Sequence, residues 1–216
     1  MKAYNKPFLA IVLILVADQV LKFWIKLNMT LGQEFHLLGK WAIIHFTENN
    51  GMAFGMEFGG EIGKLALTLF RIVAVSMIGY GVIYLIQNKY HRGLILNVAL
   101  IFAGALGNII DSAFYGLLFS ESTYFEPAKL LPAAGGYASI FHGKVVDMFY
   151  FPIIQGIIPN WSPLWAGEDF IFFRPVFNIA DAAISIGVIS ILIFQKRYFK
   201  EEKEEESYPH SEVVEE

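Results

Sequence analysis

Four long apolar stretches most constrain what this chain can fold into. They cover residues 8–25, 65–86, 93–119 and 175–194. Each is close to the length of about 20 residues that an apolar helix needs to cross a bilayer. Hydrophobic residues make up 56% of the chain and charged residues only 17%, whereas a soluble domain is about one quarter charged. The sequence therefore predicts an all-α polytopic membrane protein with four transmembrane helices.

The remaining segments define the expected organisation. We expect one membrane domain over residues 1–200, with outer segments at 27–64 and 120–174, followed by an acidic, disordered cytoplasmic tail at 201–216. The first span is expected to be retained, because no small-x-small cleavage site follows it. The chain has no cysteine, which excludes a thiol nucleophile, a disulfide framework and a cysteine metal site. No stretch interleaves basic and aromatic residues as a nucleic-acid-binding surface does, so no nucleic acid is expected.

Basic residues predict the orientation of the spans. They flank the N-terminus, the turn between the second and third spans and the end of the fourth span: Lys2, Lys6, Lys89, Arg92, Lys196, Arg197 and Lys200. Because cytoplasmic segments carry the excess of lysine and arginine, both termini are predicted to be cytoplasmic. The outer segments then face the extracytoplasmic side. The alternating stretch "KWAIIHFTEN" in the first of them predicts a small extracytoplasmic β segment.

Asparagine and aspartate recur near the outer ends of two spans. Asn108 and Asp111 lie roughly 22 and 27 Å from the inner end of the third span, at 1.5 Å per residue. If the fourth span begins at residue 175, Asn178 and Asp181 lie roughly 5 to 9 Å below its outer end. A spacing of three residues puts Asn and Asp on one face of a helix. Both pairs are therefore expected at a similar depth.

Further ionisable groups join them. Asp18 and Lys22 lie four residues apart in the outer half of the first span, and Asp147 lies in the apolar run "GKVVDMFYF" before the fourth span. Two carboxyl groups held close together share a proton and titrate as a pair. One can then activate water while the other protonates a leaving group. This chemistry hydrolyses a peptide bond without a metal, a cofactor or a covalent nucleophile.

Other interpretations of these groups stay open. The polar side chains could only hydrogen-bond the helices together, or serve a proton- or ion-coupled transporter, although the chain has no repeat symmetry that would favour a transporter. A structural assembly factor is a third alternative. Arg71 in the second span either extends toward the interface or pairs with a carboxylate. The histidines show no metal-ligand spacing, and the glycines of "AGALGN" favour close helix packing.

Taken together, five motifs resemble the signal peptidase II family, the lipoprotein signal peptidases. In chain order they are "DQVLK" (18–22), "NNGMAF" (49–54), "GALGNIID" (104–111), "VVDMF" (145–149) and "FNIAD" (177–181). The resemblance implies an intramembrane aspartic endopeptidase of the bacterial cytoplasmic (inner) membrane, with its active site near the extracytoplasmic face. It implies diacylglyceryl-modified prolipoproteins as substrates, cut on the N-terminal side of the lipidated cysteine. Substrate and membrane lipid are then the expected partners, the protein is expected to be a monomer, and no cofactor is expected.

The resemblance also assigns roles to residues. It places the catalytic pair on Asp147 and Asp181, whereas the spacing of the helical motifs alone favours Asp111 with Asp181. Supporting or substrate-binding roles fall on a larger set: Asp18, Lys22, Asn49, Gly51, Phe54, Gly104, Gly107, Asn108, Asp111, Asn178 and Ala180.

The chain departs from the family pattern in four places. Ser112 stands where the family usually has arginine, which leaves the salt bridge of that arginine open. Met52 replaces a usual small alanine. Residues 118–144 and 152–174 look like insertions on the outer face. A lid, a determinant of substrate choice and a docking site for a partner all remain open as roles for them.

Overall fold

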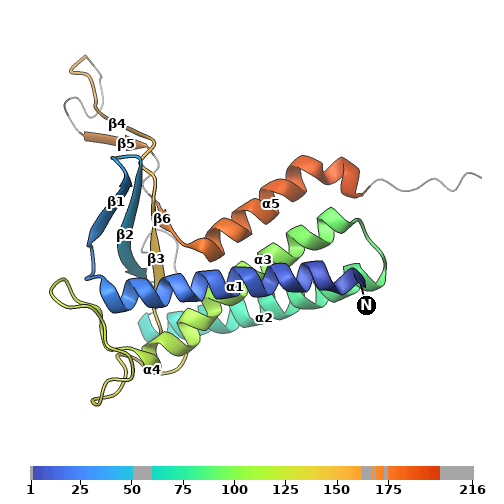
Figure 1. Ribbon diagram of the computed structural model, residues 1–216, viewed down its shortest axis with the longest axis horizontal. Helices are drawn as coiled ribbons and strands as arrows, with labels where there is room; N and C mark the ends of the chain where they lie inside the picture. The colour runs from blue at the N-terminus through green and yellow to red at the C-terminus, as the bar shows by residue number, and fades with distance from the viewer. Residues whose placement is uncertain (1, 51–59, 162–166, 168, 173–174, 200–216) are drawn as a thin grey trace, which may run out of the picture.

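Four long helices form the body of the molecule. The computed structural model describes residues 2–50, 60–161, 167, 169–172 and 175–199 (Figure 1). Its long helices are α1 (Lys2–Asn28), α2 (Gly60–Gln87), α3 (Arg92–Ile110) and α5 (Ile179–Tyr198). A π-helical turn, η2 (Asp111–Tyr115), and the short α4 (Gly116–Leu118) prolong α3. Within the described residues, four helical segments are long and apolar enough to cross a membrane, which confirms the predicted four helices.

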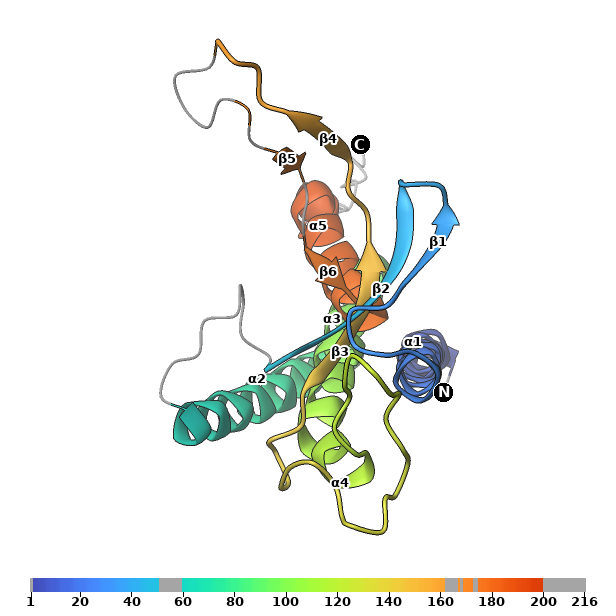
Figure 2. The same cartoon turned by 90° about the vertical axis from the view of Figure 1, so that its left-hand side faces the viewer.

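Helix α3 is central, because it packs against α1, α2 and α5 (Figure 2). The start of α1, the turn between α2 and α3 and the end of α5 lie at one end of the bundle, and the sheet lies at the other (Figure 1). Two glycines permit the close contact between α3 and α5. A Cβ atom on Gly104 would come 2.2 Å from the carbonyl oxygen of Ala180, and one on Gly187 would come 2.7 Å from that of Asn97. The prediction that the "AGALGN" glycines allow close packing is thus confirmed for Gly104.

A small antiparallel sheet covers the other end of the bundle. Its strand order is β1 (Glu34–Leu38), β2 (Ala42–Asn49), β3 (Val145–Tyr150) and β6 (Val176–Phe177). The predicted β segment after the first span is therefore confirmed, and the fold is mostly helical with a sheet rather than purely α. A separate hairpin of β4 (Ile154–Ile157) and β5 (Asp169–Phe172) projects beyond this sheet (Figure 1).

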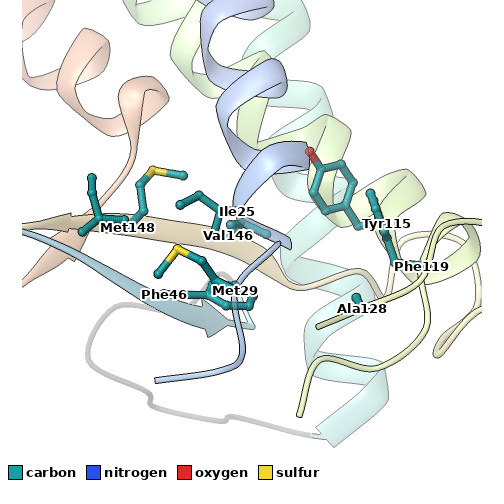
Figure 3. Close-up of a cluster of buried hydrophobic side chains, with 9 residues drawn as sticks. Ile25, Met29, Phe46, Tyr115, Phe119, Ala128, Val146 and Met148 are labelled. Atoms are coloured by element: carbon teal, nitrogen blue, oxygen red, sulfur yellow. The ribbon is translucent and has the colours of Figure 1, made fainter. Parts of the chain in front are cut away.

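An apolar cluster joins the sheet to the end of the bundle. It draws side chains from α1, β2, β3, the end of the third span and the insertion 118–144 (Figure 3). Its buried members are Ile25, Met29, Ile44, Phe46, Tyr115, Phe119, Ala128, Val146 and Met148. Burial of an aliphatic or aromatic side chain stabilises a fold by about 1.5 to 3 kcal/mol, so this cluster fixes the sheet to the ends of the helices.

The fourth helix begins later than the sequence analysis predicts. Residue 175 does not open the helix; Val176–Phe177 form β6, and Asn178 is the N-cap of α5. The Asn178 side chain accepts a hydrogen bond from the Asp181 N–H at 2.9 Å, and the Asp181 carboxylate accepts one from the Asn178 N–H at 3.4 Å. Asparagine is a strong N-cap residue, and this reciprocal capping box favours a start at Ile179. The motif "FNIAD" is therefore a junction between a strand and a helix.

Candidate active site

Asp147 lies in the middle of β3 and is almost fully buried, with 2% of its surface exposed. Its Oδ1 accepts a hydrogen bond from Asn178 Nδ2 at 2.7 Å, and its Oδ2 accepts one from Asn49 Nδ2. Burial first, and then the nearby charge of Asp181, raise the pKa of Asp147 to about 7. The Lys22 charge and the two asparagine donors oppose this shift of the pKa. The environment of Asp147 therefore favours its protonated form more than water does.

Asp181 lies in the first turn of α5 and is half-buried. Its Oδ1 accepts a hydrogen bond from Asn108 Nδ2 at 2.7 Å. Asn178 contacts both carboxyl groups: its side chain donates to Asp147 and its backbone N–H to Asp181. The charge of Asp181 also acts on Arg71 of α2, which supports the alternative in which Arg71 faces a carboxylate. The structure thus brings Asp147 and Asp181 to either side of one buried asparagine.

Lys22 organises the polar groups beneath this pair. Its Nζ lies 2.8 Å from Asp18 Oδ2 and 2.7 Å from Asp111 Oδ2, with all three side chains buried. It also donates to Asn108 Oδ1 at 3.0 Å. Because the amide oxygen of Asn108 accepts from Lys22, the amide nitrogen is directed at Asp181. Lys22 therefore sets the orientation of a side chain that touches the carboxyl pair.

Asp111 is held differently from Asp147. Besides Lys22, it accepts hydrogen bonds from Gln19 Nε2 at 2.9 Å and from the Val146 N–H at 3.4 Å. These contacts tie the end of the third span to α1 and β3. The shared asparagine links Asp181 to Asp147 rather than to Asp111, so the structure brings together the two carboxyl groups that the family resemblance implies.

The other predicted site residues divide into two groups. Asp18 Oδ1 accepts a hydrogen bond from the Ala180 N–H at 2.9 Å, which ties α1 to the start of α5. A Cβ atom on Gly107 would lie 3.1 Å from Asp18 Oδ2 and 3.3 Å from Ala180 Cβ, so glycine leaves room for this contact. The predicted substrate-binding residues Gly51 and Phe54, and the substituted position Met52, lie outside the described residues.

Ser112, which stands at the position of the family's usual arginine, is buried in the π-helical turn. Its hydroxyl donates to the Asn108 carbonyl at 3.1 Å, and its own carbonyl accepts from the Gly143 N–H at 2.8 Å. A Cβ atom on Gly143 would come 2.2 Å from the Asp111 carbonyl oxygen. The end of the insertion 118–144 therefore packs directly on the backbone at this position.

The sequence analysis missed two features of the site. One is Gln19, whose amide bonds Asp111 and also accepts from the Tyr115 hydroxyl at 3.1 Å. The other is a buried polar cluster of Lys26, Glu48 and Ser122. Its signal was partial: Lys26 lies one helical turn after Lys22 and Glu48 precedes Asn49, but nothing in the sequence distinguishes Ser122.

Comparisons with known proteins show the family and the fold of the chain. The sequence model of the family described as signal peptidase (SPase) II matches residues 10–196. A lipoprotein signal peptidase of Porphyromonas gingivalis is 53% identical over 188 residues, covering 87% of this chain and 81% of the relative. One of Amoebophilus asiaticus is 38% identical over 199 residues, covering 91% and 78%. A solved bacterial membrane enzyme superposes with a TM-score of 0.58 at 24% identity, covering 93% of this chain and 94% of its own, and shows the same fold.

Proposed function

Since the chain belongs to the signal peptidase II family, we propose that it removes signal peptides from diacylglyceryl-modified bacterial prolipoproteins. It is a multi-pass protein of the inner membrane, and cleavage falls on the N-terminal side of the lipidated cysteine. The identity of 53% to a lipoprotein signal peptidase over most of both chains carries this function. The same comparisons favour a peptidase over the transporter alternative.

The proposed mechanism is aspartic, with Asp147 and Asp181 as the catalytic pair. Asp181 is half-buried and accepts a proton from the attacking water. Asp147, with its pKa raised to about 7 by burial and by the charge of Asp181, supplies a proton. Water oxygen bonds to the carbonyl carbon of the scissile peptide, and the carbon–nitrogen bond then breaks. The proton of Asp147 goes to the leaving amine, so one carboxyl group acts as base and the other as acid.

The surrounding side chains hold this pair in place. Asn49, Asn108 and Asn178 donate to the two carboxyl groups, so each acid faces a fixed direction. Lys22 compensates the charge of the buried carboxylates behind them. Holding the reacting groups in a productive geometry lowers the barrier by removing the entropy of their alignment.

The substrate enters from the membrane in this proposal. The diacylglyceryl group stays in the bilayer while the peptide reaches the carboxyl pair at the sheet end of the helices. That end lies opposite the ends rich in lysine and arginine (Figure 1). By the positive-inside rule, the site is then near the extracytoplasmic face and both termini are cytoplasmic. One chain supplies both carboxyl groups, which supports a monomeric enzyme.

The test is cleavage of a purified diacylglyceryl-modified prolipoprotein by the full chain. Asp147→Asn and Asp181→Asn should each abolish cleavage, and Asp111→Asn should retain part of it. Gel filtration in detergent checks that each variant is folded. If Asp111→Asn abolished cleavage and Asp147→Asn did not, the acid would be Asp111 of the third span. A folded wild-type protein that leaves the substrate intact would refute the function itself.

A further inference from the structure

A second buried polar cluster lies behind the strand that carries Asp147. Lys26 of α1, Glu48 of β2 and Ser122 of the insertion 118–144 are all buried. Lys26 Nζ forms an ion pair with Glu48 and donates to Ser122 Oγ at 2.8 Å. Ser122 Oγ in turn donates to Glu48 Oε1 at 2.8 Å. The three side chains form a closed triangle, so moving any one of them leaves a buried charge with a missing partner.

The insertion 118–144 supplies most of what surrounds Lys26. The Lys26 ammonium lies 5.3 Å from the ring centroid of Phe119 and 5.0 Å from that of Tyr137, distances at which aromatic rings attract cations. The Ala128 N–H donates to the Lys26 carbonyl at 3.0 Å, which satisfies a carbonyl of the last helical turn of α1. The insertion therefore completes the end of α1 and covers its charge.

Glu48 of this cluster is the sequence neighbour of Asn49, whose amide donates to Asp147. In the β2–β3 register, Thr47 pairs with Asp147, Glu48 with Val146 and Asn49 with Val145. Side chains alternate between the faces of a strand. One face therefore presents Asn49 to Asp147, and the other presents Glu48 and Val146 to Lys26 and the apolar cluster of Figure 3. A shift of Glu48 moves the Asn49 amide that donates to Asp147.

We propose that Lys26, Glu48 and Ser122 are positioning residues, through which the insertion 118–144 holds the Asn49 amide on Asp147. This inference rests on the proposed function, because its effect is on the acid of the carboxyl pair. It assigns the insertion a role as a fixed brace behind the catalytic strand. The Lys26–Glu48 pair is buried, so it restrains the strand far more than an exposed pair would.

Glu48→Gln tests the proposal against a matched control. Glu48 and Glu121 both pair with Lys144, at 3.9 and 3.5 Å, but Glu121 is 66% exposed and Glu48 only 3%. Glu48→Gln should lower kcat roughly tenfold and change KM less than twofold, since a small misplacement of a catalytic group slows the chemical step. Glu121→Gln should leave both constants unchanged. Rates are expressed per folded enzyme, measured by gel filtration of the full chain.

Two further variants separate positioning from simple stabilisation. Ser122→Ala removes only the bridging hydroxyl and should also lower kcat with KM unchanged, which keeps the test decisive if Glu48→Gln does not fold. In an Asn49→Ala background, Glu48→Gln should lower kcat little further, because both changes act on the same hydrogen bond. Independent, multiplicative losses, or an unchanged kcat in both Glu48→Gln and Ser122→Ala, would overturn the proposal. A wild-type enzyme that cleaves the substrate in the same assay keeps this outcome distinct from failure of the proposed function.

Discussion

The pH dependence of cleavage gives the sharpest prediction, because it depends on the environment of one carboxyl group. Burial and the charge of Asp181 raise the pKa of Asp147 from 3.8 to about 7. If Asp147 donates the proton to the leaving amine, its protonated form is the active one. The wild-type rate should therefore fall as the pH rises through about 7. Because the two carboxyl groups interact, this limb belongs to the pair.

Replacing Asn49 should move that limb in a defined direction. The Asn49 amide donates to the Asp147 carboxylate and so lowers the pKa of Asp147. A hydrogen bond to a charged group contributes about 1.5 kcal/mol, which corresponds to about one pKa unit. Asn49→Ala should therefore shift the alkaline limb upward by about one pH unit. The maximum rate should fall in the same variant, because the carboxyl group is held less firmly.

The assay is kcat/KM for a diacylglyceryl-modified prolipoprotein between pH 5 and 9, which reports groups of the free enzyme. Asn88→Ala is the control, because the Asn88 side chain is exposed and donates only locally, to the Tyr84 carbonyl at 2.8 Å. Its profile should match that of the wild type. An alkaline limb that stays in place in Asn49→Ala, or moves to lower pH, would refute Asp147 as the proton donor.

Three other changes test the surroundings of the pair. Lys22→Met removes the cation shared by buried carboxylates and should destabilise the protein by about 3 to 5 kcal/mol in denaturant unfolding. Gly104→Ala puts a Cβ atom 2.2 Å from the Ala180 carbonyl oxygen and should cost about 1 to 3 kcal/mol; Gly81→Ala, with open space around it, should cost nothing. Asp147→Asn should remove a pH effect on stability. Because the folded state holds the Asp147 proton more tightly than the unfolded chain, wild-type stability should fall as the pH rises from about 4 to 7, by about 4 kcal/mol for a pKa raised to about 7. Thermal unfolding should therefore show the variant more stable than the wild type at pH 8, with the difference closing toward pH 4.

The helical part of the fold could be predicted because the signal is local. A bilayer sets the length of a span, so each apolar stretch reports its own helix. The strand that carries Asp147 could not be predicted in the same way. Its six residues, Val145–Tyr150, pair with Ala42–Asn49 about one hundred positions earlier, and no local pattern encodes such a partner. The start of the fourth helix at Ile179 was also missed, because Pro175 is an equally good first-turn residue and only the cap at Asn178 decides.

The choice between Asp111 and Asp147 in the proposed mechanism depends on contacts that spacing alone does not give. Helical geometry gives the depth and face of Asp111, but it does not show which cation reaches that group. Lys22 lies between Asp18 and Asp111, so those two carboxylates have a full positive charge between them. The hydrogen bonds to the Asp147 carboxyl group come from the amides of Asn49 and Asn178. Amides orient a carboxyl group without compensating its charge, so burial next to Asp181 leaves Asp147 with a raised pKa. In the proposed mechanism Asp147, which lies beside Asp181, is therefore the group that donates the proton, and a carboxyl pair that hydrolyses a peptide requires one such acid.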